Sequence, residues 1–355
     1  MSVFASSLVA ALDLALFCVP PAENRPECWW WFSNGMTEKA IVHDLDAMAR
    51  VGLSGFHFYG GDRTCRDGVE KCRFTLREAA KRGLRASIVI GSAGCGHPKT
   101  SDQNLQKELV FAKADVVGGN AVSLDLPRGT TKGAVSRLYH DIAVLAVPKT
   151  DVVAPESVLD LTDALVGDTL AWKGAPEGDW IVIRVGYVPR VGGNHTDTGR
   201  FIDHMSRKAF DAHWQVVMKP LLMAVTPEEK SVLRGVVCDS WEAGTCTWTE
   251  GFDAEFRKRR GYDLRRWLPF KAGVACSDAK RSEKFMRDFD LTVADLITEN
   301  HYAYKKEVAN RSGLLAITEA AGPHQNQGDG RRMQGRADVA MGEFWAVSAH
   351  RPGLA

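Results

Sequence analysis

Short apolar runs alternate with segments of helical periodicity over the first hundred residues. The apolar runs lie at 28–32, 56–59 and 84–90, and each is short enough to be a buried strand. Between them the periodicity predicts one helix over 37–52 and a second over 76–82. The apolar positions of the first helix are Ile41, Leu45, Met48 and Val51. Strands and helices that alternate through short connections predict a parallel α/β fold.

The alternation stops between about residues 116 and 188. This segment carries several short β-like runs, separated by Pro and Gly, and almost no helical pattern. The runs are clearest at 121–124, 142–147 and 180–185. They predict a small β-rich domain inserted into the α/β unit.

Alternation resumes after Gly199. A helix is expected over 203–225, although Pro220 opposes it because proline lacks an N–H and its ring clashes with the preceding turn. A longer helix is expected over 280–310. The remaining strands are expected at 235–238, 314–317 and 337–341.

The expected βα strands number six, near residues 29, 56, 87, 236, 315 and 339. A closed (β/α)₈ barrel needs eight strands. A doubly wound sheet could be complete at six, but its first strand usually leads into a glycine-rich phosphate loop. Here that position holds Ser33-Asn34-Gly35, which favours a (β/α)₈ TIM-type barrel that is incomplete. The expected segments are an N-terminal segment 1–19, a first barrel part 20–115, the β-rich insert 116–190, and a second barrel part 191–355 that is truncated at its C-terminus.

Composition excludes several classes of partner. The chain carries 45 Lys and Arg against 44 Asp and Glu, a formal net charge of +1, so nothing predicts binding to nucleic acid. None of the eight cysteines has the close paired spacing of a zinc site. The first nineteen residues are apolar but lack a basic start, and Asp13 interrupts them, so they make a weak signal peptide. No segment is long and apolar enough to predict a membrane span.

Three of the expected strands run into a glutamate at their C-terminal ends: Glu242, Glu319 and Glu343. A carboxylate at the end of a buried strand costs free energy unless it is hydrogen-bonded, paired or used in chemistry. Each could pair with a basic residue such as Arg234 or Arg336, or cap the next helix. Three at equivalent positions, with tryptophans nearby, favour the active-site edge of a barrel instead. Cleavage of a glycosidic bond needs such a pair of carboxyl groups.

Several motifs, in order along the chain, resemble α-L-rhamnosidases of glycoside hydrolase family 106. They are Pro20-Pro21 with Trp29-Trp30-Trp31, Asp44 through Met48, Gly94 through Pro98, Tyr139 through Pro148, Asp239 through Glu242, and Asp338 through Trp345. The resemblance implies a hydrolase that acts on terminal α-L-rhamnosides in glycans or glycosides by an inverting mechanism. It also implies a periplasmic or secreted protein with a calcium ion near its site. Carboxylates suit such a hard cation, but the sequence names no metal ligands.

The same resemblance implies that Glu242 is the general acid and Glu343 the general base. Glu319 would be a third essential carboxylate that binds sugar hydroxyls, a metal or the water, and Glu319 and Glu343 could exchange roles. The candidate substrate contacts are Asp239, Trp241, Trp31, His97 and Trp345. Two alternatives stay open: a degenerate or truncated barrel that binds carbohydrate without turnover, and a related glycosidase with another sugar specificity.

Overall fold

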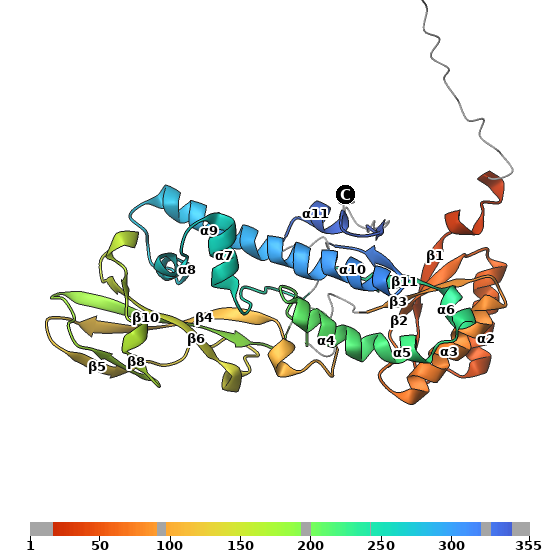
Figure 1. Ribbon diagram of the computed structural model, residues 1–355, viewed down its shortest axis with the longest axis horizontal. Helices are drawn as coiled ribbons and strands as arrows, with labels where there is room; N and C mark the ends of the chain where they lie inside the picture. Colours follow the sequence, from red (N-terminus) through yellow and green to blue (C-terminus); the bar gives the residue numbers. More distant parts are fainter. Residues whose placement is uncertain (1–16, 91–96, 193–199, 242, 321–327, 343–355) are drawn as a thin grey trace, which may run out of the picture. The chain divides into compact units, whose positions relative to one another are not determined.

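The computed structural model describes residues 17–90, 97–192, 200–241, 243–320 and 328–342, which form two compact units. The first comprises Met1–Val89 with Pro220–Arg234, and the second comprises Ile90–Lys219 with Gly235–Ala355. Figure 1 shows the elements of both. Each unit is described here by itself.

The first unit is built on three parallel strands, β1 (Glu27–Trp31), β2 (Gly55–Tyr59) and β3 (Arg85–Val89), with β2 in the middle. Helices α2 (Glu38–Arg50) and α3 (Arg66–Ala80) connect them. The predicted parallel βαβ alternation is therefore confirmed here. The second helix starts ten residues before its predicted start, and Val69 and Cys72 in these added residues are buried.

The spacing of its apolar residues and the capping of its two ends stabilise helix α2 and set its limits. Its buried residues are Ile41, Leu45 and Met48, and the Thr37 hydroxyl caps its first turn by accepting from the Ala40 N–H at 3.2 Å. Val51, the fourth apolar position expected for this helix, follows it in the structure and is 70% exposed. Gly52 has a positive φ of 81°, which ends the helix at low steric cost.

Pro220 is accommodated because it lies near the start of a short helix rather than inside a long one. The predicted helix over 203–225 is in fact two helices, α4 (Arg207–Val217) and α5 (Lys219–Ala224). Pro220 is the second residue of α5, where its missing N–H leaves no helical bond unmade. Helix α6 (Pro227–Val232) follows. Its buried Glu229 binds Arg73 at 2.9 Å and Arg77 at 2.6 Å, which attaches α6 to α3.

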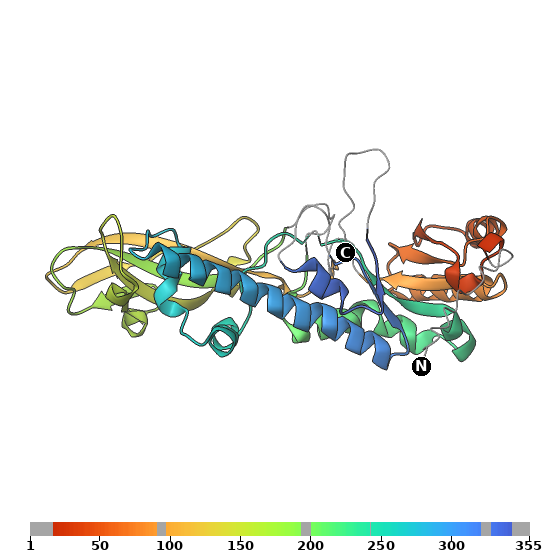
Figure 2. The ribbon, with the colours of Figure 1, turned by 90° about the horizontal axis from the view of Figure 1, so that it is seen from above.

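The second unit holds the other three parallel strands. These are β11 (Leu233–Cys238), whose first two residues belong to the first unit, β12 (Leu315–Thr318) and β13 (Val339–Ala340), with β12 in the middle. The predicted helix over 280–310 is α9 (Ala279–Ile297), one π-helical turn (Thr298–Ala303) and α10 (Tyr304–Arg311). Figure 2 shows these three pieces as one continuous rod.

Antiparallel strands make up the β-rich part of the second unit. One sheet has the order β4-β10-β6-β7, and a smaller one has the order β5-β9-β8. Their bounds are β4 Lys107–Val117, β5 Val122–Asp125, β6 His140–Pro148, β7 Leu159–Asp160, β8 Leu165–Val166, β9 Thr169–Trp172 and β10 Asp179–Pro189. The remaining α-helices are α7 Phe252–Arg260, α8 Leu268–Lys271 and α11 Gly330–Gln334. Single 3₁₀ turns lie at 22–24, 102–104, 136–138, 155–157, 162–164 and 265–267.

The four-stranded sheet has two buried faces. Val144 and Val182 pack toward the smaller sheet, in a core that includes Trp172 and Trp180. The alternate residues of the same strands, such as Leu145 and Ile183, belong to a second core with residues of α7 and α9. The β-rich strands therefore share a core with helices that follow later in the chain, which explains why all of them fall in one compact unit.

The described sheets are open. None of them closes on itself within the residues that the structure describes, so the fold is an α/β fold with several sheets, and the closed barrel stays a prediction. In the same residues no helix has both the length and the apolar character needed to cross a bilayer.

Arg184 of β10 joins the two sheets. Its side chain is fully buried, and its guanidinium donates to both Asp141 carboxylate oxygens at 2.7 and 2.8 Å, to Asp168 at 2.9 Å and to the Leu126 carbonyl at 2.7 Å. The planar fork matches this arrangement of acceptors, and an ammonium group cannot reproduce it.

Replacing Arg184 by lysine should lower the free energy of unfolding by about 2–3 kcal/mol, because several charge-assisted bonds are lost around a buried group. Urea unfolding measures the change. Arg128→Lys is the matched control, since Arg128 also binds Asp168 but both side chains are more than half exposed. It should change stability by less than about 0.5 kcal/mol. Equal effects of the two substitutions would contradict this account.

Candidate functional site

The carboxyl ends of β11 and β12 bring two predicted site residues together. Asp239 directly follows β11 and Glu319 directly follows β12. The strands pair in parallel up to Cys238 and Thr318, and the Glu319 N–H then donates to the Cys238 carbonyl at 3.0 Å. Asp239 is half-buried and Glu319 is only 3% exposed. Two carboxyl groups therefore lie at adjacent strand ends, and Glu319 is one of the three glutamates expected at such a position.

Three other predicted site residues, Glu242, Glu343 and Trp345, lie outside the described residues. The nearest described neighbours of the first are Trp241 and Ala243, both in the core. The strand before Glu343 is placed next to β12, because the Met341 N–H donates to the Thr318 carbonyl at 2.8 Å.

Trp241 is buried beneath the strand end. It is 2% exposed, its indole N–H donates to the Gly244 carbonyl at 3.2 Å, and its ring centroid lies 4.4 Å from that of His204. This hydrogen bond connects the residues after β11 to Gly244. Its predicted contact with substrate stays a prediction.

The remaining two candidates lie in different units. His97, in the second unit, is half-buried, and its Nδ1 accepts from the Lys99 N–H at 3.1 Å. Trp31, in the first unit, is 71% exposed, and its ring centroid lies 4.1 Å from that of Tyr59. Trp30 points to the opposite face of the sheet, where its N–H donates to Asp44 at 3.0 Å. Of the three consecutive tryptophans, Trp31 is therefore the most accessible to a ligand.

A buried polar layer lies under the ends of β11 and β12. His301 Nε2 is 3.8 Å from the Cys238 sulfur, and the His301 and His204 ring centroids are 4.7 Å apart. The ammonium group of Lys305 donates to the Thr318 hydroxyl and to the Ile317 carbonyl. The Tyr302 hydroxyl donates to the Ala320 carbonyl at 3.3 Å.

The π-helical turn supplies part of this layer. His301 and Tyr302 lie in the turn, and Lys305 follows it in α10. A π turn shifts the helical register by one residue, and such turns are frequent at functional sites. His301 and Lys305 could not be identified from the sequence. They are four residues apart on an apolar helix, which is also the spacing of core positions, and only the tertiary fold distinguishes the two cases.

Burial keeps these histidines neutral. Desolvation lowers the pKa of His204 to about 3, with a smaller contribution from the charge of His213, and it lowers the pKa of His301 well below 6.5. His213 is also buried and contacts the Ile90 carbonyl at 2.6 Å. The buried neutral imidazole rings make this layer poorly solvated. Poor solvation raises the pKa of a nearby carboxylic acid and so favours its protonated form.

The described residues do not test the calcium expectation. Within them, no group of three or more His, Cys, Asp or Glu side chains is placed to hold a metal ion. The strand-end carboxylates Asp239 and Glu319 offer oxygen ligands of the right type, but by themselves they are too few for a calcium site.

Sequence comparison gives the family to which this α/β fold belongs. The profile of glycoside hydrolase family 106, described as alpha-L-rhamnosidase, matches residues 18–145 and 130–353, so the chain belongs to this family.

Two relatives extend the comparison. A protein of Formosa agariphila (strain DSM 15362), whose name assigns it provisionally to the beta-glucuronidases, is 30% identical over 382 residues, which cover 93% of this chain and 32% of the relative. The structure of a rhamnosidase from Novosphingobium sp. PP1Y superimposes with a TM-score of 0.79 at 21% identity, over 91% of this chain and 48% of that protein. The chain thus spans about a third and about a half of these two relatives.

The buried histidines should make folding stability depend on pH. In the unfolded chain His204 and His301 take up protons below about pH 6.5, but in the folded protein they do not. Their contribution is therefore fully present above pH 6.5 and is lost as the pH falls, at up to about 1.4 kcal/mol per pH unit for each histidine. Urea unfolding between pH 7 and pH 5 measures the slope.

His204→Gln should reduce this slope by up to about 1.4 kcal/mol per pH unit, which corresponds to the uptake of one proton. Phe210→Leu is the matched control, because Phe210 packs on the His301 ring at 5.6 Å but does not titrate. It should destabilise the protein equally at all pH values in this range. An unchanged slope in His204→Gln would mean that this histidine titrates alike in the folded and unfolded states.

Proposed function

We propose that the protein is an inverting α-L-rhamnosidase that hydrolyses terminal α-L-rhamnosyl groups of glycans or glycosides. Family membership supports this proposal. So does the position of Asp239 and Glu319 at adjacent carboxyl ends of parallel strands. That position is where enzymes with (β/α)₈ barrels carry their chemistry, and we propose that the six parallel strands are part of such a barrel.

The general acid in this proposal is Glu242. It follows β11 by four residues, and its neighbours Trp241 and Ala243 are buried. An apolar environment raises the pKa of a carboxyl group, so that it can keep a proton for the leaving oxygen at neutral pH. The buried neutral histidine His204 under Trp241 adds to the dry character of this edge.

The general base is Glu343, after β13, which would remove a proton from the attacking water. Glu319 is buried at the end of β12, the strand between β11 and β13. It would bind sugar hydroxyls, the water or a calcium ion. An exchange of roles between Glu319 and Glu343 is compatible with the same strand order. Asp239, Trp31, His97 and Trp345 are proposed substrate contacts.

A second candidate sugar comes from the relative in Formosa agariphila, whose provisional name refers to β-glucuronides. A glucuronide differs from a rhamnoside by a carboxylate, so the two activities need different charges in the site. Aryl α-L-rhamnoside and aryl β-glucuronide assayed side by side with the full-length protein would separate them. Turnover of the glucuronide alone would overturn the rhamnosidase assignment, and sugar binding without any turnover would favour a non-catalytic role.

Glu242→Gln should lower kcat on natural rhamnosides about 10²–10⁴-fold, since the amide keeps the shape but cannot donate a proton. The loss should be much smaller on aryl rhamnosides whose leaving group departs unprotonated. Glu343→Gln should lower kcat on both substrates, because both need an activated water.

Glu283→Gln serves as the control for these variants, since Glu283 is an exposed glutamate on α9. It should leave kcat within twofold of the wild type. Near-normal turnover of natural rhamnosides by Glu242→Gln would exclude Glu242 as the acid.

The stereochemistry of the product tests the inverting mechanism. An inverting pair holds its carboxyl groups about 6.5–9.5 Å apart and leaves room for a water, so the first product from an α-L-rhamnoside should be β-L-rhamnose. Proton NMR of the anomeric signal, recorded before mutarotation, detects it. Initial release of α-L-rhamnose would show a retaining enzyme, with a carboxylate nucleophile about 5 Å from the acid.

A further inference from the structure

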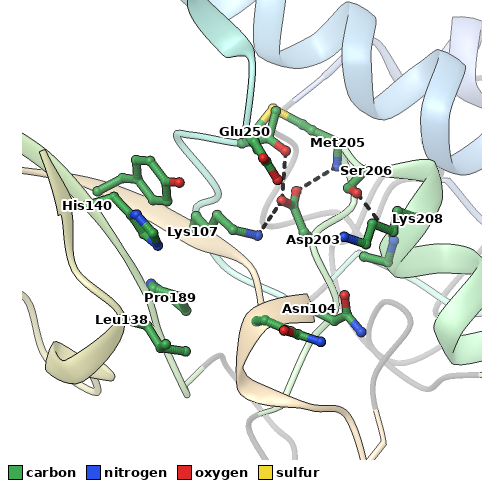
Figure 3. Close-up of a pocket in the computed structure, with 14 residues that line it drawn as sticks. Asn104, Lys107, Leu138, His140, Pro189, Asp203, Met205, Ser206, Lys208 and Glu250 are labelled. Atoms are coloured by element: carbon green, nitrogen blue, oxygen red, sulfur yellow. Dashed lines mark hydrogen bonds and ion pairs between the residues drawn. The ribbon is translucent and has the colours of Figure 1, made fainter. Parts of the chain in front are cut away.

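A pocket of about 350 Å³ lies within the second unit, apart from the strand-end carboxylates (Figure 3). The first residue of β4, the first residue of β6, the end of β10, the start of α4 and the loop after β11 line it. Its volume lies at the lower end of the range of small-molecule sites, which is roughly 300–1,000 Å³. The lining includes Lys107, His140, Tyr187, Asp203, Lys208 and Glu250.

The base of the pocket is a fixed polar group. Asp203 is fully buried and accepts hydrogen bonds from the Lys107 ammonium at 2.8 Å, the Thr249 hydroxyl at 2.8 Å and the Met205 N–H at 3.1 Å. Burial alone would lower the pKa of Lys107, but the Asp203 carboxylate outweighs it and raises that pKa, so the Lys107 ammonium group stays charged. A buried ion pair this well bonded is held rigidly and can orient a ligand.

One wall of the pocket is aromatic. The His140 ring lies nearly parallel to Tyr187, with centroids 4.9 Å apart and an angle of 18°, and Tyr187 lies over buried Trp248 at 6.3 Å and 23°. Burial raises the pKa of Tyr187, so its hydroxyl remains a hydrogen-bond donor at neutral pH. His140 is exposed at the outer end of this column and presents a flat face.

The charges around the pocket cancel. Lys107 neutralises Asp203, and the other two charged residues of the lining, Lys208 and Glu250, have opposite signs. Figure 3 shows Lys208 and Glu250 on either side of Asp203. A neutral ligand with several hydroxyl groups fits such a lining better than an anion or a cation does, and ring side chains with a few fixed polar groups are typical of small-molecule sites.

We propose that this pocket is a subsite for a neutral sugar residue of the glycan, next to the strand-end site. The two are linked in the chain: Asp203 forms the base of the pocket, and the next residue, His204, packs on Trp241 with ring centroids 4.4 Å apart, two residues after Asp239. The inference rests on the proposed function, in that the sugar bound here belongs to the same substrate whose terminal residue is cleaved.

The test compares a neutral rhamnosyl-glucose disaccharide with an aryl α-L-rhamnoside, using the full-length protein. His140→Ala and Glu250→Gln each remove one contact, and both residues are exposed. In each variant the ratio of kcat/KM on the disaccharide to kcat/KM on the aryl rhamnoside should fall about three- to tenfold. His43→Ala is the matched control, because His43 is an exposed histidine that does not line the pocket. An unchanged ratio in both variants would overturn the proposal.

Calorimetric binding of the same disaccharide gives a second readout that needs no turnover. An affinity for the disaccharide that is three- to tenfold lower in His140→Ala than in the wild type supports the subsite, even if the enzyme hydrolyses no rhamnoside. The two proposals can therefore fail separately. Equal affinity of wild type and both variants would overturn the subsite. Tighter binding of a uronic-acid disaccharide than of the neutral one would overturn the assignment of a neutral sugar. Thermal melts identical to the wild type establish that the variants are folded.

Discussion

The parallel pairing of β11 with β12 is the constraint on which the candidate site depends. Parallel strands end at the same edge of a sheet, so residues that follow them in the sequence must become neighbours in space. The backbone bond from Glu319 to Cys238 extends this pairing past the last strand residues and fixes Glu319 next to the start of the Asp239 turn. A shift of one residue in this register would turn each side chain to the other face of the sheet.

The layer beneath these strand ends sets their electrostatic character. His204, His301 and Lys305 are all buried, and two of them stay neutral because burial opposes their protonation. Lys305 is bonded to Thr318 at the end of β12. The π turn between α9 and α10 places His301 and Lys305 against the strands, and a regular helix would rotate them away by about a quarter turn. The irregular turn is thus part of how the fold builds the site.

The β-rich strands contribute to the same unit through their two buried faces. One face packs against the small sheet and the other against α7 and α9, and α9 continues through the π turn into α10, which contacts β12. Lys107 at the start of β4 and Tyr187 near the end of β10 line the pocket beside Asp203. Because β4 and β10 pair over their full length, these pocket residues are positioned by a continuous hydrogen-bonded ladder.

The sequence by itself determined the local structure and the type of chemistry. The apolar runs and helical spacing placed five of the six parallel strands to within two residues, and the strand near 339 to its centre, because burial of one face imposes a period on the chain. The acidic residues after the apolar runs predicted Glu319 at a strand end, and the structure places it directly after β12, next to the strand that Asp239 follows. Only the tertiary structure decided that buried Trp241 packs against His204 and that Lys107 binds Asp203 ninety-six residues away. These features depend on contacts between residues distant in sequence, and no local periodicity encodes such contacts.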